Sequence, residues 1–177
     1  MRIGIVGAGK LGLPVALAIE SRGHDVSVYD TNPAVAGFLD DRQIPFEEEG
    51  LQPLLDNHKL RTAGSVGELV GRSDIIFLAI QTPHSPEYEG VTRLPDTRAD
   101  FDYQYIKTAL SEVSRACAEL ATRKTVAVIS TCLPGTYNSK LKPLTNEWVD
   151  YVYTPQFIAM GTVLEDYLHP EFNLVGV

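Results

Sequence analysis

Three glycines near the start of the chain limit its possible folds more than any other feature. The stretch GIVGAGKLG places Gly7, Gly9 and Gly12 at the spacing G-x-G-x-x-G, directly after the apolar run 2–6. Counted from Gly4, the same letters nearly spell G-x-x-x-x-G-K, a loop that binds phosphate in nucleotide hydrolases. Both loops bind phosphate, so the residues around them must decide between two unrelated functions.

The hydrolase loop is excluded by the residue that follows Lys10. That loop needs a serine or threonine directly after its lysine, because the hydroxyl group coordinates magnesium, and here this position is Leu11. Gly4 also lies between Ile3 and Ile5, inside an expected strand, where it cannot begin a loop that wraps a phosphate. The G-x-G-x-x-G interpretation remains.

In a dinucleotide-binding turn with this spacing, each glycine has its own task. Gly7 would form the tight turn out of the strand, Gly9 would let the backbone approach a pyrophosphate, and Gly12 would let the following helix pack closely on the sheet. The dipole of that helix favours an anion at its N-terminus. A second apolar run, VSVYD, ends at Asp30, whose carboxylate can accept hydrogen bonds from ribose hydroxyls and would repel a 2′-phosphate. The expected cofactor is therefore NAD and not NADP.

Short apolar runs alternate with helical patterns along the chain, which is typical of parallel strands joined by helices. We therefore expect an α/β protein with a Rossmann-type doubly wound fold, in which a mostly parallel six-stranded sheet carries helices on both faces. Residues 1–177 are taken as one domain. The expected strands cover residues 2–6, 26–30, 74–80, 125–130, 151–153 and 173–177.

Helices are expected between these strands. The nearly all-apolar segment 11–21 predicts a helix buried against the sheet, and segment 31–64 predicts a short helix and a second one near 48–58. Ser65 and Glu68 have the spacing of a capping box, which predicts the start of another short helix.

The region between residues 102 and 121 predicts a longer helix with one buried face. The residues of that face are Ile106, Leu110, Val113, Cys117 and Leu120. Residues 81–101 contain several prolines and no periodicity, so they predict a long loop, and loops of that length are often functional.

Charge and composition narrow the possible partners. A formal net charge of −8 opposes binding to nucleic acid, and no apolar run is long enough for a membrane helix. The chain starts with an apolar strand and glycines in place of a signal peptide, so we expect a cytoplasmic protein. The 4 histidines are scattered, and the 2 cysteines, Cys117 and Cys132, lack metal-site spacing, so no metal is expected.

Several motifs are spread in order over almost the whole chain. They are GAGKLGLPVA at 7–16, IPFEEEGLQPLL at 44–55, DIIFLAIQTP at 74–83, STCLPGTY at 130–137 and YTPQFIAMGTVLEDYLHPEFNLVG at 153–176. In these motifs the chain resembles the N-terminal NAD-binding domain of the UDP-glucose/GDP-mannose dehydrogenase family. The resemblance implies a protein that oxidises the C6 alcohol of a nucleotide sugar to a carboxylate in two NAD-dependent steps, in polysaccharide biosynthesis, and that forms a homo-oligomer at full length.

The resemblance also assigns site residues. The implied cofactor-binding residues are Gly7, Gly9, Lys10, Leu11, Gly12, Asp30, Thr82, Pro83 and Thr131. Thr131 would in addition support catalysis, and Gln156 would lie on the substrate side. The family's nucleophilic cysteine and catalytic lysine belong to a later, substrate-binding region that this chain does not include, so the chain alone is not expected to turn over.

Some positions depart from the family pattern. The family reads roughly P-E-F-L-R-E-G where this chain has Gln156 and Met160 in place of both glutamates, and neither side chain can act as a general base. Lys10 stands where an aromatic residue is common, and its ammonium group either adds charge near the phosphates or points to solvent. Cys132 has no partner base in the sequence and is not expected to be a nucleophile.

Two alternative functions stay open from the sequence. One is a paralogous dehydrogenase with a different substrate, of the hydroxyacid or 6-phosphogluconate type. The other is a non-catalytic nucleotide-binding module that kept the fold and lost the chemistry.

Overall fold

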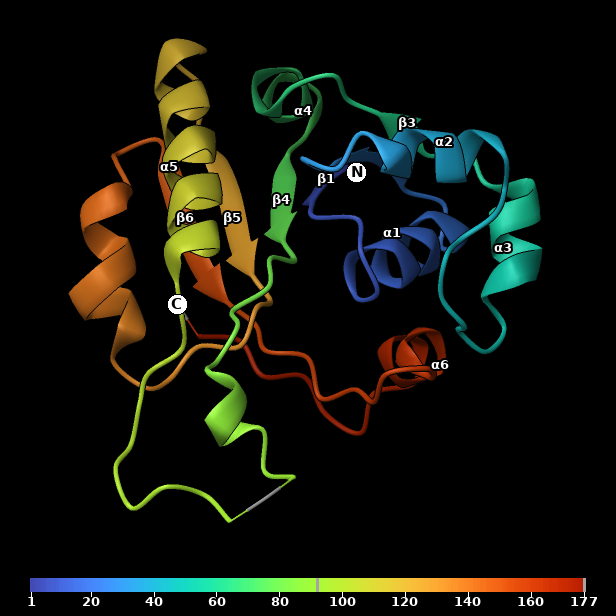
Figure 1. Cartoon of the computed structure of the whole chain (residues 1–177). Coiled ribbons are helices and arrows are strands. Elements are labelled where there is room, and N and C mark those ends of the chain that lie inside the picture. Colours follow the sequence, from blue (N-terminus) through green and yellow to red (C-terminus); the bar gives the residue numbers. More distant parts are fainter. Residues whose placement is uncertain (92, 177) are drawn as a thin grey trace.

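The fold is built on a six-stranded sheet in which every neighbouring pair of strands is parallel. The structure, a computed structural model, describes residues 1–91 and 93–176. The strands are β1 (Arg2–Val6), β2 (Asp25–Tyr29), β3 (Arg61–Thr62), β4 (Ile75–Leu78), β5 (Lys124–Val128) and β6 (Val149–Tyr153). Their order is β3-β2-β1-β4-β5-β6, so the winding direction reverses between β1 and β4, as in doubly wound folds. Figure 1 shows β1 and β4 side by side at this point.

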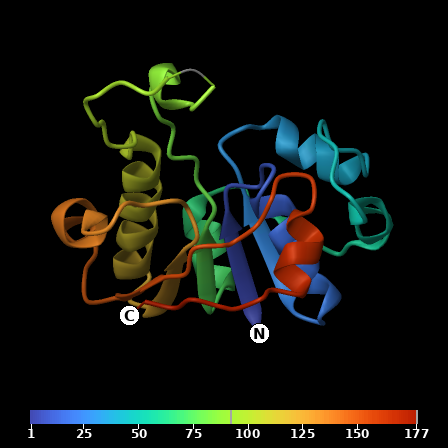
Figure 2. The same cartoon turned by 90° about the horizontal axis from the view of Figure 1, so that it is seen from below.

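Helices cover both faces of the sheet. They are α1 (Gly12–Ser21), α2 (Ala34–Asp40), α3 (Leu51–Asn57), α4 (Val66–Arg72), α5 (Gln104–Glu119) and α6 (Val163–Leu168). One hydrophobic core joins α1, α2, α3 and α6 to one face, and a second core joins α4 and α5 to the other. Figure 2 shows α6 beside α1, although the two helices lie at opposite ends of the chain. The predicted Rossmann-type fold is confirmed.

The first helix is buried because almost all of its residues are apolar. Leu13, Val15 and Leu17 have 2% or less of their surface exposed. Gly4 lies within β1, and a Cβ atom there would come within 2.5 Å of Ser73 Oγ, so this glycine allows close packing under the sheet. The hydrolase interpretation of Gly4 therefore has no structural support.

The capping box predicted from Ser65 and Glu68 starts α4. Ser65 Oγ accepts a hydrogen bond from the Glu68 backbone N–H at 3.1 Å, and Glu68 Oε2 accepts one from the Gly64 N–H at 2.8 Å. The carboxylate therefore reaches one residue further back than the usual N-cap amide.

Two predictions are wrong, one about a strand of the sheet and one about a helix packed against it. Residues 173–176 form no strand, because Gly176 makes a single antiparallel bridge to Tyr153, and Val177 lies outside the described residues. The sixth strand is instead the short, exposed β3. Leu120 was expected in the buried face of α5 but has 49% of its surface exposed, because the helix ends at Glu119 and the chain turns away there.

The predicted loop at 81–101 is interrupted only by a short 3₁₀ turn at Pro86–Tyr88 within its described part, and it projects beyond the carboxyl ends of the strands (Figure 1). Further short turns are formed by Tyr137–Leu141 and Lys142–Leu144. Among residues 1–91 and 93–176, no helix has the length and apolar character needed to cross a membrane.

The turn after α5 predicts a stabilising substitution at Ala121. The Ala121 and Thr122 amides donate to the carbonyls of Ala118 and Cys117, both at 3.0 Å, and Ala121 has a φ of 47°, so the helix ends in a Schellman motif with alanine at the position that favours glycine. We expect Ala121→Gly to raise the free energy of unfolding by about 0.5–1 kcal/mol. Urea denaturation measures this change.

The exposed residue Ala118 provides the control, because it lies inside the same helix with ordinary helical geometry. Ala118→Gly should lower the free energy of unfolding by about 1 kcal/mol. A loss of stability in both variants would contradict the assigned strain at Ala121.

Candidate functional site

A cleft of about 740 Å³ lies at the carboxyl ends of the central strands. It lies where the winding of the sheet reverses, which is the usual ligand position in open parallel sheets. The sequence-predicted residues that line it are Gly7, Gly9, Lys10, Leu11, Asp30, Thr82, Thr131 and Gln156. Gly12 and Pro83 are not among its lining residues.

The glycine turn between β1 and α1 forms the floor of the cleft. Gly7 has a φ of +92°, and a Cβ atom on Gly12 would lie 1.8 Å from Gly7 O, so these two glycines are required by the protein itself. A Cβ atom on Gly9 would meet nothing within 4 Å. The protein's own packing therefore does not require Gly9, and its missing side chain leaves room beside the cleft.

The residues that lead into α1, Gly9, Lys10 and Leu11, line this space. The N-cap residue, Leu11, makes no side-chain capping bond, and the first turn carries no acidic residue. Within residues 1–91 and 93–176, no hydrogen bond uses the backbone N–H groups of Gly9, Lys10 or Leu11. Free amides at the positive end of a helix favour an anionic ligand such as a phosphate.

Asp30 is held at the edge of the cleft by two backbone amides. Its Oδ2 accepts a hydrogen bond from the Ala8 N–H and its Oδ1 accepts one from the Asn32 N–H, both at 2.8 Å. Each carboxylate oxygen has more than one acceptor direction, so further donors can still bind. The carboxylate is thus oriented before any ligand arrives.

The predicted threonines meet on the other side of the glycine turn. Thr82 Oγ1 donates a hydrogen bond to Thr131 O at 2.9 Å, which joins the ends of the β4 and β5 segments. Ser130 strengthens this junction, because its buried Oγ accepts from the Ile80 N–H at 2.9 Å and donates to Leu78 O at 3.2 Å. Ser130 is not among the site residues predicted from the sequence.

Pro83 lies outside the lining of the cleft, and its predicted contact with the cofactor stays a prediction. It is exposed, and its carbonyl oxygen accepts a hydrogen bond from the Asp102 N–H at 2.7 Å, which closes the base of the long loop. Lys10 lines the cleft and is exposed, and no ion pair within the described ranges involves it.

Two further walls complete the cleft. The segment after β6 contributes Gln156, Ile158 and Met160, and Gln156 Nε2 donates to Thr154 O at 2.9 Å. Helix α5 contributes a wall that the sequence analysis missed, formed by Tyr105, Thr108, Ala109 and Glu112. These residues lie next to the buried stripe of α5, and the apolar periodicity that revealed the stripe gave no signal for them.

Comparison with known proteins agrees with this geometry. Residues 1–177 match the model of the UDP-glucose/GDP-mannose dehydrogenase family, NAD binding domain. The chain belongs to this family.

Individual relatives of this dehydrogenase domain cover nearly its whole length. GDP-mannose 6-dehydrogenase of Pseudomonas aeruginosa is 30% identical over 188 aligned residues, with 99% of this chain and 41% of the relative covered. A ternary-complex crystal structure of GDP-mannose dehydrogenase from that bacterium has a TM-score of 0.86 at 29% identity, covering 99% of this chain and 41% of that one. UDP-glucose dehydrogenase of the archaeon Pyrobaculum islandicum has a TM-score of 0.85 at 26% identity, covering 99% and 40%. The chain thus spans about two fifths of the length of these relatives.

The dehydrogenase domain has features that fit NAD. The open space beside Gly9, the free amides of α1 and the oriented carboxylate of Asp30 all border one cleft. Among residues 1–91 and 93–176, no group of three or more His, Cys, Asp and Glu side chains is placed to hold a metal ion.

Cys132 of the dehydrogenase domain has a thiol that resists ionisation. It is half-buried, and its desolvation, together with the carboxylate of Asp100, raises its pKa to about 11. The thiolate is the nucleophilic form, so this environment opposes a covalent role.

The pKa of Cys132 predicts how its alkylation depends on pH. At pH 8 only about 0.1% of a thiol with such a pKa is thiolate, so iodoacetamide should label Cys132 in the folded protein at least about tenfold more slowly than in the unfolded protein. The labelling rate of the folded protein should keep rising through pH 10, where an unshifted thiol has already levelled off. Peptide mapping by mass spectrometry measures both rates, and equal rates at pH 8 would contradict the shift.

Proposed function

We propose that this chain is the NAD-binding part of a nucleotide-sugar 6-dehydrogenase of the UDP-glucose/GDP-mannose type. The observation that carries the proposal is the single cleft that joins the glycine turn, the uncapped start of α1 and the Asp30 carboxylate. The whole protein would oxidise the C6 alcohol of its substrate to a carboxylate and would act in polysaccharide biosynthesis.

In this proposal each part of the cleft has a separate task. The amides of Gly9, Lys10 and Leu11 would bind the pyrophosphate, and the Asp30 carboxylate would accept hydrogen bonds from the adenosine ribose. Gly12 would act indirectly, by letting α1 approach the turn, and Lys10 would add positive charge beside the phosphates. The carboxylate would also disfavour a 2′-phosphate, which makes NAD the preferred cofactor.

The nicotinamide half would lie toward the ends of β4, β5 and β6. Thr82 and Thr131 would border it there, while Gln156 would face the substrate. Bound NAD supplies the hydride acceptor, and the chain's own residues would orient the ring and exclude water. Pro83 would border the cofactor next to Thr82, and its carbonyl oxygen, which accepts a hydrogen bond from the Asp102 N–H, would fix the base of the loop.

An altered or lost oxidation is the second candidate, and one observation favours it. Gln156 and Met160 line the cleft, and neither side chain can take a proton from an alcohol or activate a water. A different substrate, of the hydroxyacid or 6-phosphogluconate type, or a non-catalytic nucleotide-binding module would fit that observation. Assaying NAD reduction by the complete product of the gene with UDP sugars, GDP sugars and hydroxyacids distinguishes the three.

The proposed setting of the protein is the cytoplasm, where NAD is available to an oxidoreductase. We further propose a homo-oligomer for the full-length protein, with a nucleotide sugar as substrate and neither nucleic acid nor membrane as a partner. The formal net charge of −8 supports the exclusion of nucleic acid.

Chemical-shift mapping tests the proposed placement of NAD. In ¹H–¹⁵N spectra, NAD should shift the amide signals of Gly9, Lys10 and Leu11 the most, because these groups would change from solvent to phosphate partners. The amide of Gly37, on the exposed side of α2, should not move. Shifts confined to residues outside the cleft would contradict the placement.

A further inference from the structure

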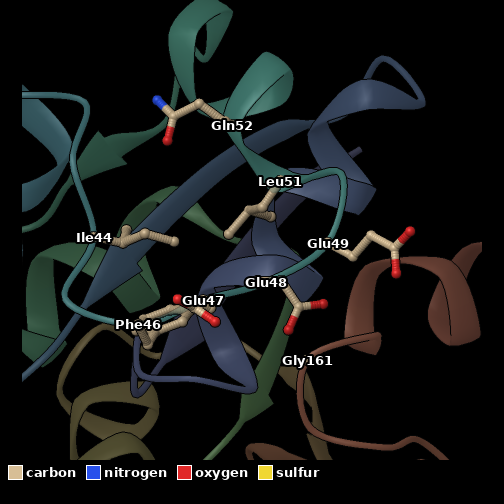
Figure 3. Close-up of a pocket in the computed structure, with 8 residues that line it drawn as sticks. All are labelled: Ile44, Phe46, Glu47, Glu48, Glu49, Leu51, Gln52 and Gly161. Atoms are coloured by element: carbon tan, nitrogen blue, oxygen red, sulfur yellow. The ribbon is translucent and has the colours of Figure 1, made fainter.

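The turn that leads into α3 is bound to the segment that follows β6. The Glu49 N–H donates a hydrogen bond to Gly161 O at 2.9 Å, and Glu48 Oε1 accepts one from the Leu164 N–H at 2.9 Å. Figure 3 shows the Glu48 side chain pointing toward the chain at Gly161, whereas Glu47 points elsewhere. The bond between Glu48 and Leu164 joins residues 116 positions apart, so it ties two distant parts of the sequence together.

Glu48 acts as the N-terminal cap of α6. The N-cap residue of this helix, Thr162, makes no side-chain capping bond, and Leu164 carries one of the amides that a helix leaves unpaired at its start. A carboxylate at this position accepts a hydrogen bond from the amide, and its negative charge interacts favourably with the positive end of the helix dipole. The half-buried Glu48 therefore takes the capping role that a side chain at the N-cap position usually has in a helix.

The position of α6 determines the position of one cleft wall. Segment 155–162 lies between β6 and α6 and carries Ile158 and Met160, which line the cleft. Asp166 of α6 binds this segment directly, since its Oδ2 accepts a hydrogen bond from the Ala159 N–H at 2.9 Å. A displacement of the start of α6 would therefore move the wall as well.

We propose that Glu48 is a positioning residue, which holds segment 155–162 against the nicotinamide half of the cleft through its bond to the Leu164 N–H. The inference rests on the proposed function, because that function assigns the nicotinamide to this half. Glu48 does not line the cleft itself, so it would act on the cofactor only through the wall.

Comparing two ligands of different length tests this role. ADP carries the adenosine and the pyrophosphate alone, whereas NAD extends toward segment 155–162. By isothermal titration calorimetry, Glu48→Ala should weaken NAD binding about fivefold and leave ADP binding within about twofold of the original protein. Glu48→Gln keeps an oxygen acceptor for the Leu164 amide and should restore most of the NAD affinity.

Glu47→Ala is the matched control, because it removes the neighbouring, exposed carboxylate. It should leave both affinities unchanged. In the ligand-free protein, hydrogen exchange of the Leu164 amide should be about tenfold faster in Glu48→Ala than in the original protein, and near the original rate in Glu48→Gln and Glu47→Ala.

The outcomes separate the inference from the proposed function. If the original protein binds both ligands and Glu48→Ala leaves the ratio of the NAD and ADP affinities unchanged, only the role of Glu48 is overturned. Failure of glutamine to restore NAD affinity also overturns it. If the original protein binds neither ligand, the proposed function fails together with the inference.

Discussion

Replacing Gly12 by alanine is expected to destabilise the protein by about 3 kcal/mol and to abolish measurable NAD binding. A Cβ atom at this position would lie 1.8 Å from Gly7 O and 3.1 Å from Ala79 Cβ, so α1 or the glycine turn must move. Backbone atoms cannot rotate away as a flexible side chain can, which makes the clash costly. For a chain of this size, the melting temperature should fall by about 10 °C. Differential scanning calorimetry measures this change.

Gly9 provides a control, because its replacement by alanine should affect NAD binding and leave stability nearly unchanged. Alanine at this position would meet no protein atom within 4 Å, so Gly9→Ala should fold with nearly unchanged stability. The added methyl group would still occupy the space proposed for the pyrophosphate and should weaken NAD binding at least about tenfold. Full stability of Gly12→Ala, or unchanged NAD affinity of Gly9→Ala, would contradict the account of the turn.

Replacing Asp30 by asparagine is expected to weaken NAD binding about 10- to 100-fold, the range for losing a hydrogen bond to a charged group. The substitution removes the charge. In the original protein the carboxylate accepts hydrogen bonds from the N–H groups of Ala8 and Asn32, whereas the NH₂ group of asparagine would face one of these two donors. The preference for NAD over NADP should shrink at the same time, because the repulsion of a 2′-phosphate is lost. Calorimetric titration with both cofactors measures the two affinities.

Asp41 offers a matched control for the loss of charge. It is an exposed residue at the end of α2 and is not among the lining residues of the cleft. Asp41→Asn should leave the affinity for both cofactors unchanged. If it weakened NAD as much as Asp30→Asn, the effect would come from net charge and not from the site.

The sheet could be predicted where strands are buried and apolar. The runs that became β1, β2, β4 and β5 are apolar because both faces of the sheet are covered by helices. β3 consists of Arg61 and Thr62, both exposed, so it gives no hydrophobic signal and forms only by pairing with β2. The opposite error arose at 173–177, because within the described part, 173–176, Leu174 and Val175 stay exposed and only Gly176 forms a bridge.

The candidate site could be predicted where its residues lie in one short motif. The glycine turn and Asp30 follow from local spacing, because each glycine has a distinct steric task. The capping of α6 by Glu48 could not be predicted, since it depends on how distant segments meet in space. The α5 wall with Tyr105 and Glu112 was missed for a similar reason, because only the packing of the helix determines which of its polar residues face the cleft.

We propose above all that this cleft binds NAD through the backbone amides of Gly9, Lys10 and Leu11 and through the carboxylate of Asp30. Isothermal titration calorimetry of the chain with NAD and with NADP tests it most directly. We expect one NAD per chain, bound at least about tenfold more tightly than NADP, since the 2′-phosphate would face the Asp30 carboxylate. Tighter binding of NADP, or no heat of binding with either cofactor, would contradict it.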